Sequence, residues 1–384
     1  MLASRRSKGI IQAVIAVAVV ALIVASLFFA RRSGEKITLG EADWAMPGGN
    51  PSHTSFLSFA PRDNLRELWG TRLESELAGP PAIAGDRVYV SCKNGFLYCL
   101  ELETGRPVWR YETGSGLTSM PAVCEQGILA GTVDGKVLCL DAGGKLAWKV
   151  DVGGAVVSTP VPQGGRVYFG SRDGYLYCVD ARNGKRVWSF QAEGPIEVSP
   201  CVYEGQVFGI SLNGNLFALR AEDGRLAWTY LCEEAPAALP VADEGRIYQA
   251  TETTLHCADV QSGKRLWTSF VGSRIVSNPA LRGSQVQVVQ GWEGQPSTVI
   301  ALDARTGDPL WKVFSGDTSG WTWLFSSTRD VYLAGPGQLR ALLAESGAIS
   351  LQRDIDGALS ETLTVSRDRI LVGTESRKVF CFSE

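Results

Sequence analysis

Histidine is almost absent from this chain, which has only two among 384 residues, His53 and His256. Neither stands at a metal-ligand spacing, so a histidine-based zinc or copper site is not expected. His53 is interpreted as a local structural contact, and His256 as an imidazole that packs within its blade or lies at the rim. The sequence also lacks a Walker phosphate-binding loop, a G-x-S-x-G motif and a zincin motif. It therefore offers no candidate catalytic residue, cofactor-binding residue or metal ligand.

A strong charge of one sign is also missing, because the formal net charge is -3 and the pI is about 5.7. Without a basic field, no nucleic-acid partner is expected. Only one long hydrophobic run occurs in the sequence. It covers residues 9–30, which carry no charge and lie between basic flanks. Such a run is long enough to span a bilayer as a helix. The alternative is a cleaved signal peptide.

The prediction from this segment is a cytosolic tail over residues 1–8, a transmembrane anchor over 9–30 and a linker with a lead-in segment over 31–60. Residues 61–384 then form the folded domain. A short basic tail favours retention of the N-terminus in the cytosol. The localisation expected for the domain is therefore extracytoplasmic, periplasmic or extracellular, on a single-pass membrane anchor.

Tryptophan is the feature that the folded part has in abundance, and it recurs at a nearly constant interval. The gaps between successive markers are 40, 39, 40, 40, 39 and 44 residues, and one more step of 40 reaches Leu351. A fixed period of this length is the signature of a repeat architecture. The markers are Trp69, Trp109, Trp148, Trp188, Trp228, Trp267 and Trp311.

Each interval has the same internal order of signals. A proline stands twelve residues after each of the first six markers, followed by a β-rich run, and in four repeats an Asn-Gly or Asp-Gly pair such as Asn94-Gly95 comes next. This pair is a strong hairpin signal, because a type I′ turn needs two residues at positive φ. Two more strands follow before the next marker. Four short antiparallel strands per repeat predict propeller blades.

Eight strand sets can be counted, so the fold class predicted is an all-β, eight-bladed propeller. The last set ends near residue 382 without a terminal strand, whereas the strand around Trp69 has no set before it. Pairing these two removes two open sheet edges. The N-terminal strand is therefore expected to complete the C-terminal blade. Each repeated Trp is predicted to pack at a blade junction.

The motifs Trp-x11-Pro, D/N-G-x-L-Y and T-G-x-x-x-W resemble the repeats of PQQ-binding-like β-propeller proteins, over about residues 43–384. The opening segment from Asp43, which includes His53, is similar to the lead-in of many such proteins. The eight repeats resemble the non-catalytic, BamB-like branch. That resemblance implies a protein-protein interaction scaffold in the cell envelope, with docking roles for the repeat Trp residues.

The same resemblance raises two other functions: a small-molecule, quinone-like binding or sensing module, and a PQQ-dependent dehydrogenase. The catalytic group carries an adjacent Cys-Cys pair over its cofactor, and this sequence has none. It also lacks long insertions that would build a deep pocket. The first hypothesis is therefore a non-enzymatic scaffold without a cofactor.

Nine cysteines are present, and five of them share one position in the third strand of a repeat. A small, buried slot explains them as apolar thiols. Those at other positions could include one disulfide pair, which the sequence does not identify. The five are Cys99, Cys139, Cys178, Cys257 and Cys381, and the others are Cys92, Cys124, Cys201 and Cys232.

Departures from the repeat are the places where partner binding is expected. The interval after Trp267 is longer, and its excess carries Trp292. The next repeat has Trp323 in place of the regular proline and Trp321 two residues earlier. Trp292, Trp321 and Trp323 are the candidate partner-binding residues, because aromatic side chains on loops are typical anchors. The alternative for Trp321 and Trp323 is packing inside an irregular blade junction.

Overall fold

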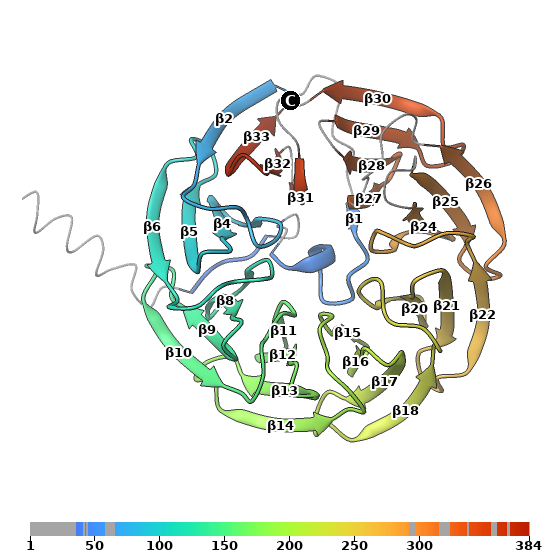
Figure 1. Cartoon of the computed structure of the whole chain (residues 1–384), viewed down its shortest axis with the longest axis horizontal. Helices are drawn as coiled ribbons and strands as arrows, with labels where there is room; N and C mark the ends of the chain where they lie inside the picture. Colours follow the sequence, from blue (N-terminus) through green and yellow to red (C-terminus); the bar gives the residue numbers. More distant parts are fainter. Residues whose placement is uncertain are drawn as a thin grey trace, which may run out of the picture.

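The computed structural model describes residues 36–40, 43, 45–57, 66–291, 297–314, 323–335, 338–354, 359–366 and 369–383. They form a ring of eight sheets around a common centre (Figure 1). The fold class predicted for this part, an all-β propeller of eight four-stranded antiparallel blades, is confirmed. No helix in the described ranges is long and apolar enough to cross a membrane. The predicted anchor, residues 9–30, lies outside them.

Blades 1 to 4 each consist of four consecutive strands. Blade 1 has β3 (Ala82–Ala84), β4 (Arg87–Ser91), β5 (Phe96–Glu101) and β6 (Pro107–Glu112), and blade 2 has β7 (Ala122–Cys124), β8 (Gly127–Gly131), β9 (Lys136–Leu140) and β10 (Leu146–Asp151). Blade 3 has β11 (Val161–Gln163), β12 (Arg166–Gly170), β13 (Tyr175–Asp180) and β14 (Arg186–Gln191). Blade 4 has β15 (Cys201–Tyr203), β16 (Gln206–Ile210), β17 (Asn215–Arg220) and β18 (Leu226–Leu231).

The second half of the ring follows the same strand order, and blades 7 and 8 each gain a further strand from the N-terminal part of the chain, as described below. Blade 5 has β19 (Val241–Asp243), β20 (Arg246–Ala250), β21 (Thr254–Asp259) and β22 (Arg265–Phe270), and blade 6 has β23 (Ala280–Arg282), β24 (Gln285–Gln290), β25 (Thr298–Asp303) and β26 (Pro309–Phe314). Blade 7 has β27 (Trp323–Ser327), β28 (Asp330–Gly335), β29 (Gln338–Leu343) and β30 (Ile349–Asp354). Blade 8 has β31 (Leu359–Ser366), β32 (Arg369–Thr374) and β33 (Lys378–Ser383).

The ring closes as the sequence predicted. Strand β2 (Arg66–Arg72) pairs antiparallel with β33 and supplies the outer strand of blade 8, with Trp69 opposite Cys381. Blade 7 departs from the four-strand expectation, because β1 (Phe56–Leu57) adds a fifth strand parallel to β27. The chain's beginning therefore joins two blades, one at the outer edge and one at the inner edge.

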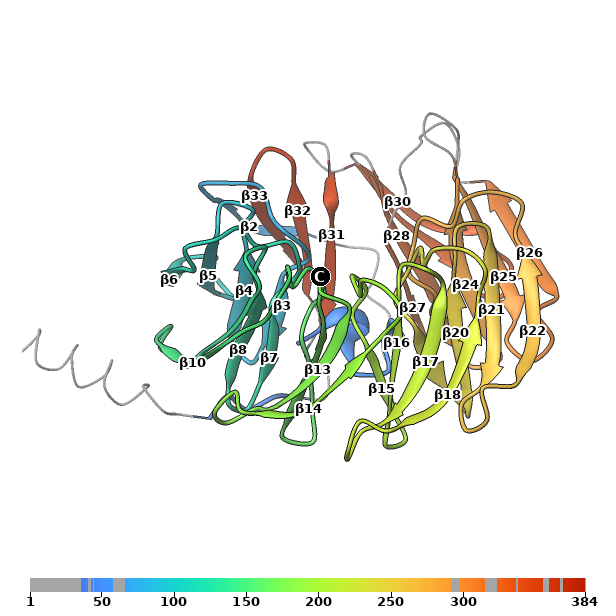
Figure 2. The same cartoon turned by 60° about the horizontal axis from the view of Figure 1, so that its bottom comes forward.

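The strand order follows from a gradient of burial across each blade. The second and third strands are almost fully buried, as in β4 and β5, whereas outer strands such as β14 alternate with a single buried Trp at the centre. The core therefore lies between neighbouring blades, and the fourth strands form the outer wall that surrounds the ring (Figures 1 and 2). A short 3-10 turn, η1 (Pro47–Gly49), lies at the centre of the ring.

Candidate functional site: blade junctions, ring centre and outer wall

The repeat Trp residues lie at seven of the eight blade junctions. Each indole Nε1 donates a hydrogen bond of 2.8–3.1 Å to a backbone carbonyl in the following blade. Trp69 reaches Leu102 across the closing junction, and Trp311 reaches Ala344 in blade 7. Leu351 takes the marker position in blade 7, opposite Ala341. A buried indole N–H needs such a partner, so each bond fixes the position of two blades.

A glycine of the following blade receives the flat face of each indole. Gly263 has φ of 67°, and a Cβ built on it would lie 2.5 Å from Cδ2 of Trp228. Only glycine accepts both the left-handed backbone and the close indole. Glycine stands at this position after every marker, which explains the T-G-x-x-x-W motif in physical terms.

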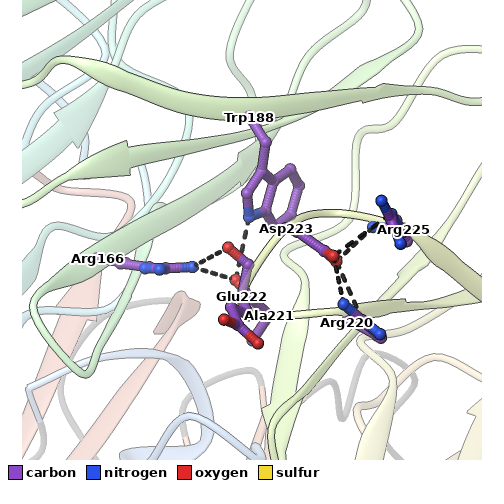
Figure 3. A network of polar contacts seen from close by, with 7 residues as sticks. All are labelled: Arg166, Trp188, Arg220, Ala221, Glu222, Asp223 and Arg225. Carbon is purple, nitrogen blue, oxygen red and sulfur yellow. Dashed lines mark hydrogen bonds and ion pairs between the residues drawn. The ribbon is translucent and has the colours of Figure 1, made fainter.

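Side chains on the surface reinforce some junctions. Between blades 3 and 4, Arg166 Nη1 donates to the carbonyls of Ala221 and Glu222, and Ala221 also accepts from Trp188 (Figure 3). In the same loop, Asp223 pairs with Arg220 and Arg225 (Figure 3). These groups hold the loop that carries the acceptor carbonyl.

The ring centre holds the lead-in segment, residues 43–57 as far as they are described. Its carbonyls accept hydrogen bonds from the middle residue of the innermost strand in blades 2, 4, 5 and 6, and from Ser326 in blade 7. The bonds are Val123 N to Ala45 O, Val202 N to Pro51 O, Ala242 N to Ser52 O, Leu281 N to Thr54 O and Ser326 N to Ser55 O, with lengths of 2.7–3.0 Å. Blade 3 has Pro162 at this position, and proline has no N–H to donate.

His53 is buried within the lead-in, with 1% of its surface exposed. Its Nδ1 is 3.1 Å from the carbonyl oxygen of Pro240 in blade 5, and Nε2 has no hydrogen-bond partner among the residues that the structure describes. Burial lowers the pKa of His53 to about 4, although the bond to Pro240 opposes this shift. His53 is therefore neutral at pH 7, with Nδ1–H as the donor to the carbonyl.

His256 of blade 5 has hydrogen-bond contacts at both ring nitrogens, one of them across the junction with blade 4. Its Nδ1 is 3.0 Å from the hydroxyl of Tyr230, and Nε2 is 3.3 Å from Oγ1 of Thr251. Thr251 in turn donates to Glu234 over 2.7 Å. Burial lowers the pKa of His256, and the carboxylate of Glu234 partly opposes it. A buried imidazole with two partners is a packed structural group, and it is poorly placed to act as a general base.

The cysteines are all buried, all lie within the described residues, and none forms a disulfide. The five at the shared position each lie opposite the marker Trp of their own blade, as Cys178 does opposite Trp188. A small side chain there leaves room for the indole. Burial raises the pKa of Cys178 and of Cys257 to about 12, so neither supplies a thiolate at neutral pH.

The candidate partner-binding residues fall largely outside the described part of the chain. Trp292 and Trp321 are not among the described residues, and of Trp323 only its place as the first residue of β27 is described. Their proposed contacts therefore stay predictions. Within the described ranges, no group of three or more His, Cys, Asp and Glu side chains is placed to hold a metal ion.

Sequence reasoning missed a set of exposed apolar side chains on the outer wall. Leu231, Phe270 and Phe314 end the outer strands of blades 4, 5 and 6, with 61%, 73% and 71% of their surfaces exposed. Each stands three residues after its marker Trp. Aligning the repeats at this position would have revealed them, because the other blades have polar residues there.

Together these features define an eight-bladed β-propeller whose junctions are built on Trp-marked repeats and whose centre is crossed by its own lead-in. The family model described as "Outer membrane protein assembly factor BamB" matches residues 62–142, 133–239, 233–333 and 295–384. These matches cover almost the whole ring, and the chain belongs to this family.

Solved structures with the same fold have low sequence identity. BamB from Moraxella catarrhalis matches with a TM-score of 0.70 and 19% identity, over 84% of this chain and 100% of that one. The quinohemoprotein alcohol dehydrogenase from Comamonas testosteroni gives 0.75 and 14%, over 93% and 82%. The computationally designed Ika8 protein gives 0.73 and 15%, over 83% and 100%. Comparison with the curated proteins gives no match.

Proposed function

We propose that the chain is a non-catalytic protein-protein interaction scaffold of the cell envelope. Membership of the BamB family along the whole ring is the observation that carries this proposal. The family model is described as an outer membrane protein assembly factor, and the similar structure from Moraxella catarrhalis is named BamB. Rigid blades with hydrogen-bonded junctions suit a scaffold, because binding residues held on fixed strands and short loops lose little conformational entropy.

The scaffold is proposed to sit on the outer side of a membrane, held by residues 9–30 and with the propeller extracytoplasmic. Its partners are then other envelope proteins, bound through blade loops. Carbonate extraction and protease accessibility of intact spheroplasts, from which any outer membrane barrier has been removed, test this placement. Retention in the membrane fraction with a protease-accessible propeller is the expected result. Release by carbonate, or digestion only after lysis, would contradict the placement.

Trp292, Trp321 and Trp323 are proposed as partner contacts. The test is co-purification of detergent-solubilised full-length protein carrying Trp292→Ala. Val133→Ala is the matched control, because Val133 is an exposed apolar residue on the corresponding hairpin of blade 2. Loss of partners in the first variant and retention in the second are expected. Unchanged partners in both would remove Trp292 from the interface.

A second candidate is binding of a quinone, or PQQ-dependent alcohol oxidation, which the likeness to the Comamonas enzyme brings forward. The residues present do not fit that group. The chain has no adjacent Cys-Cys pair, the described residues include no acidic metal cluster, and the lead-in lies among the innermost strands. Incubation with PQQ and calcium, followed by absorbance and dye-linked alcohol oxidation, tests this candidate. A bound chromophore with turnover would replace the scaffold proposal.

A further inference from the structure

The last residue of each outer strand occupies an equivalent position in all eight blades, three residues after the marker. Aligned on the marker, this position is charged or polar in five blades and apolar in three. The polar residues are Arg72, Glu112, Asp151, Gln191 and Asp354, and the apolar ones are Leu231, Phe270 and Phe314. Every one of the eight side chains is exposed. The backbone therefore presents this residue to solvent regardless of its chemistry.

The three apolar residues occupy consecutive blades, on β18, β22 and β26, which are neighbours along the outer wall (Figure 1). We call Leu231, Phe270 and Phe314 the apolar band. Isolated exposed apolar residues are ordinary, but these three large side chains share one repeat position in consecutive blades, which makes this arc of the wall a candidate interaction site.

The band contributes little to packing within the blades. The cross-strand neighbours of the three residues are short polar side chains: Asn215 opposite Leu231, Thr254 opposite Phe270 and Thr298 opposite Phe314. In blade 2, by contrast, Asp151 lies opposite Lys136, a pair of opposite charges. The blades could therefore place polar residues at the band without loss of core contacts.

The shape and charge of the wall limit what could cover the band. The wall is convex, because the outer strands follow the circular outline of the ring (Figure 1). Two convex walls, or a convex wall and a flat bilayer, touch over a narrow strip, whereas a specific interface buries about 800 Å² on each partner. Between the band and the opposite ends of the three strands, Leu266 and Leu310 are exposed beside Thr229 and Thr268, and the exposed charged residues are Arg265 and Lys312. Two positive charges fall short of the basic cluster of about 4–8 side chains that attracts anionic lipid.

We infer that the apolar band binds an extended, uncharged, apolar-rich segment of a partner protein, which bends around the wall and spans blades 4 to 6. This inference rests on the proposed scaffold function and names its surface and the chemistry of its partner. Large apolar side chains of such a segment would cover Leu231, Phe270 and Phe314, and aromatic anchors of this kind dominate many interfaces.

Site-specific photo-crosslinking in the cells that make the full-length protein tests the inference. The photoreactive residue p-benzoylphenylalanine replaces Phe270 in one variant. In the matched control it replaces Glu112, which ends β6 at the same repeat position. Digestion and mass spectrometry then identify the crosslinked peptide. The expected result is a protein adduct at position 270, with an apolar, uncharged peptide of another protein, and no such adduct at position 112.

A second comparison asks whether one segment spans the band. With the crosslinker at 270, adding Leu231→Glu and Phe314→Glu should abolish the adduct, while Asp151→Asn and Gln191→Glu should leave it. Thermal unfolding of each purified variant shows whether it is folded. Persistence of the adduct in the Leu231→Glu, Phe314→Glu variant would overturn the inference.

Other occupants give different products. A crosslink to a peptide of this same chain would show that a second copy of the protein covers the band. A lipid adduct alone would show that the membrane covers it. Either result overturns the inference, as does the absence of any adduct at 270. If partners still co-purify with the full-length protein in that last case, the scaffold proposal stands and only the assigned surface is wrong.

Discussion

The outer wall differs between blades 4 to 6 and blades 8, 1 and 2, although the strands that build it are equivalent. Arg72, Glu112 and Asp151 end the outer strands of blades 8, 1 and 2, whereas Leu231, Phe270 and Phe314 end those of blades 4, 5 and 6. Behind both arcs, a marker Trp faces inward and bonds to the next blade. The repeat therefore dictates the interior and leaves the outward residue free to serve another purpose.

The two arcs also differ at the ring centre. The lead-in accepts one backbone hydrogen bond from the innermost strand of each of blades 4, 5, 6 and 7, through Pro51, Ser52, Thr54 and Ser55. On the opposite side, the contacts among the described residues include Val123 of blade 2, which donates to the carbonyl of Ala45, and Gly85 of blade 1, which donates to the side chain of Asp43. The arc with the apolar band is thus tied to the lead-in at the ring centre through all of its three blades.

The largest effect is expected from the marker Trp residues, and it should be the same in both arcs. Trp148→Ala and Trp228→Ala each remove a buried indole and should each lower the free energy of unfolding by about 3–5 kcal/mol. Urea unfolding followed by circular dichroism measures the loss. A loss of unfolding free energy in only one of the two variants would mean that the junctions of the two arcs are not equivalent, which would contradict the comparison.

Acid should weaken the ring centre through His53. Its pKa is about 4 in the folded chain and about 6.5 when unfolded, so the unfolded state binds the proton first. The stability that depends on neutral His53 is complete above pH 6.5 and falls as the pH drops toward 4, by about 3 kcal/mol in total.

The measurement is the free energy of unfolding between pH 4 and 7 for the wild type and for His53→Asn. Asparagine does not titrate and tolerates the positive φ of 60° at this position. The wild type should lose more stability on acidification than the variant. Parallel pH curves would show that His53 is not the group responsible.

Substitution of the glycine at a blade junction should have a smaller effect on the free energy of unfolding. Gly263→Ala adds a Cβ against Trp228, whereas Gly245→Ala in the same blade adds one where no atom lies within 4 Å. Both residues have positive φ, so both variants carry the backbone cost of about 1–2 kcal/mol for a Cβ in the left-handed region. Gly263→Ala should lose about 1–3 kcal/mol more, because of overpacking. Equal unfolding midpoints would show that the indole adjusts freely.

The smallest effect on stability is expected at the wall. Phe270→Glu and the reciprocal Glu112→Phe should each change the free energy of unfolding by no more than about 0.5 kcal/mol, because both positions are exposed. Thermal unfolding of the purified variants measures this. A substantial loss in Phe270→Glu alone would mean that the apolar side chain is part of the fold.

Much of the fold could be predicted because every repeat carries nearly the same structural signals. The Trp spacing and the Asn-Gly and Asp-Gly turns gave the blade count, and the unpaired strand around Trp69 gave the closure with β33. The path of the lead-in could not be predicted, since its bonds run from backbone carbonyls to strands 78 to 271 residues away and use no side-chain pattern. Likewise, β1 is only two residues long and adds to blade 7 without a sequence signal.

The candidate site was harder to predict for a different reason. Sequence reasoning looked for irregular loops and so chose Trp292, Trp321 and Trp323, whose contacts remain predictions. It passed over Phe270 and Phe314 because an apolar residue in a strand is normally assigned to the core. Alignment of the repeats separates these two residues from the polar residues of other blades, and the structure shows that both side chains are exposed.

The most direct measurement compares two triple variants of the full-length protein for partner binding and stability. One carries Leu231→Glu, Phe270→Glu and Phe314→Glu, and the other carries Arg72→Gln, Glu112→Gln and Asp151→Asn. Both should unfold at nearly the wild-type temperature, and only the first should lose its co-purifying envelope proteins. If the first variant keeps those partners, or unfolds at a much lower temperature, the apolar arc is not a binding surface.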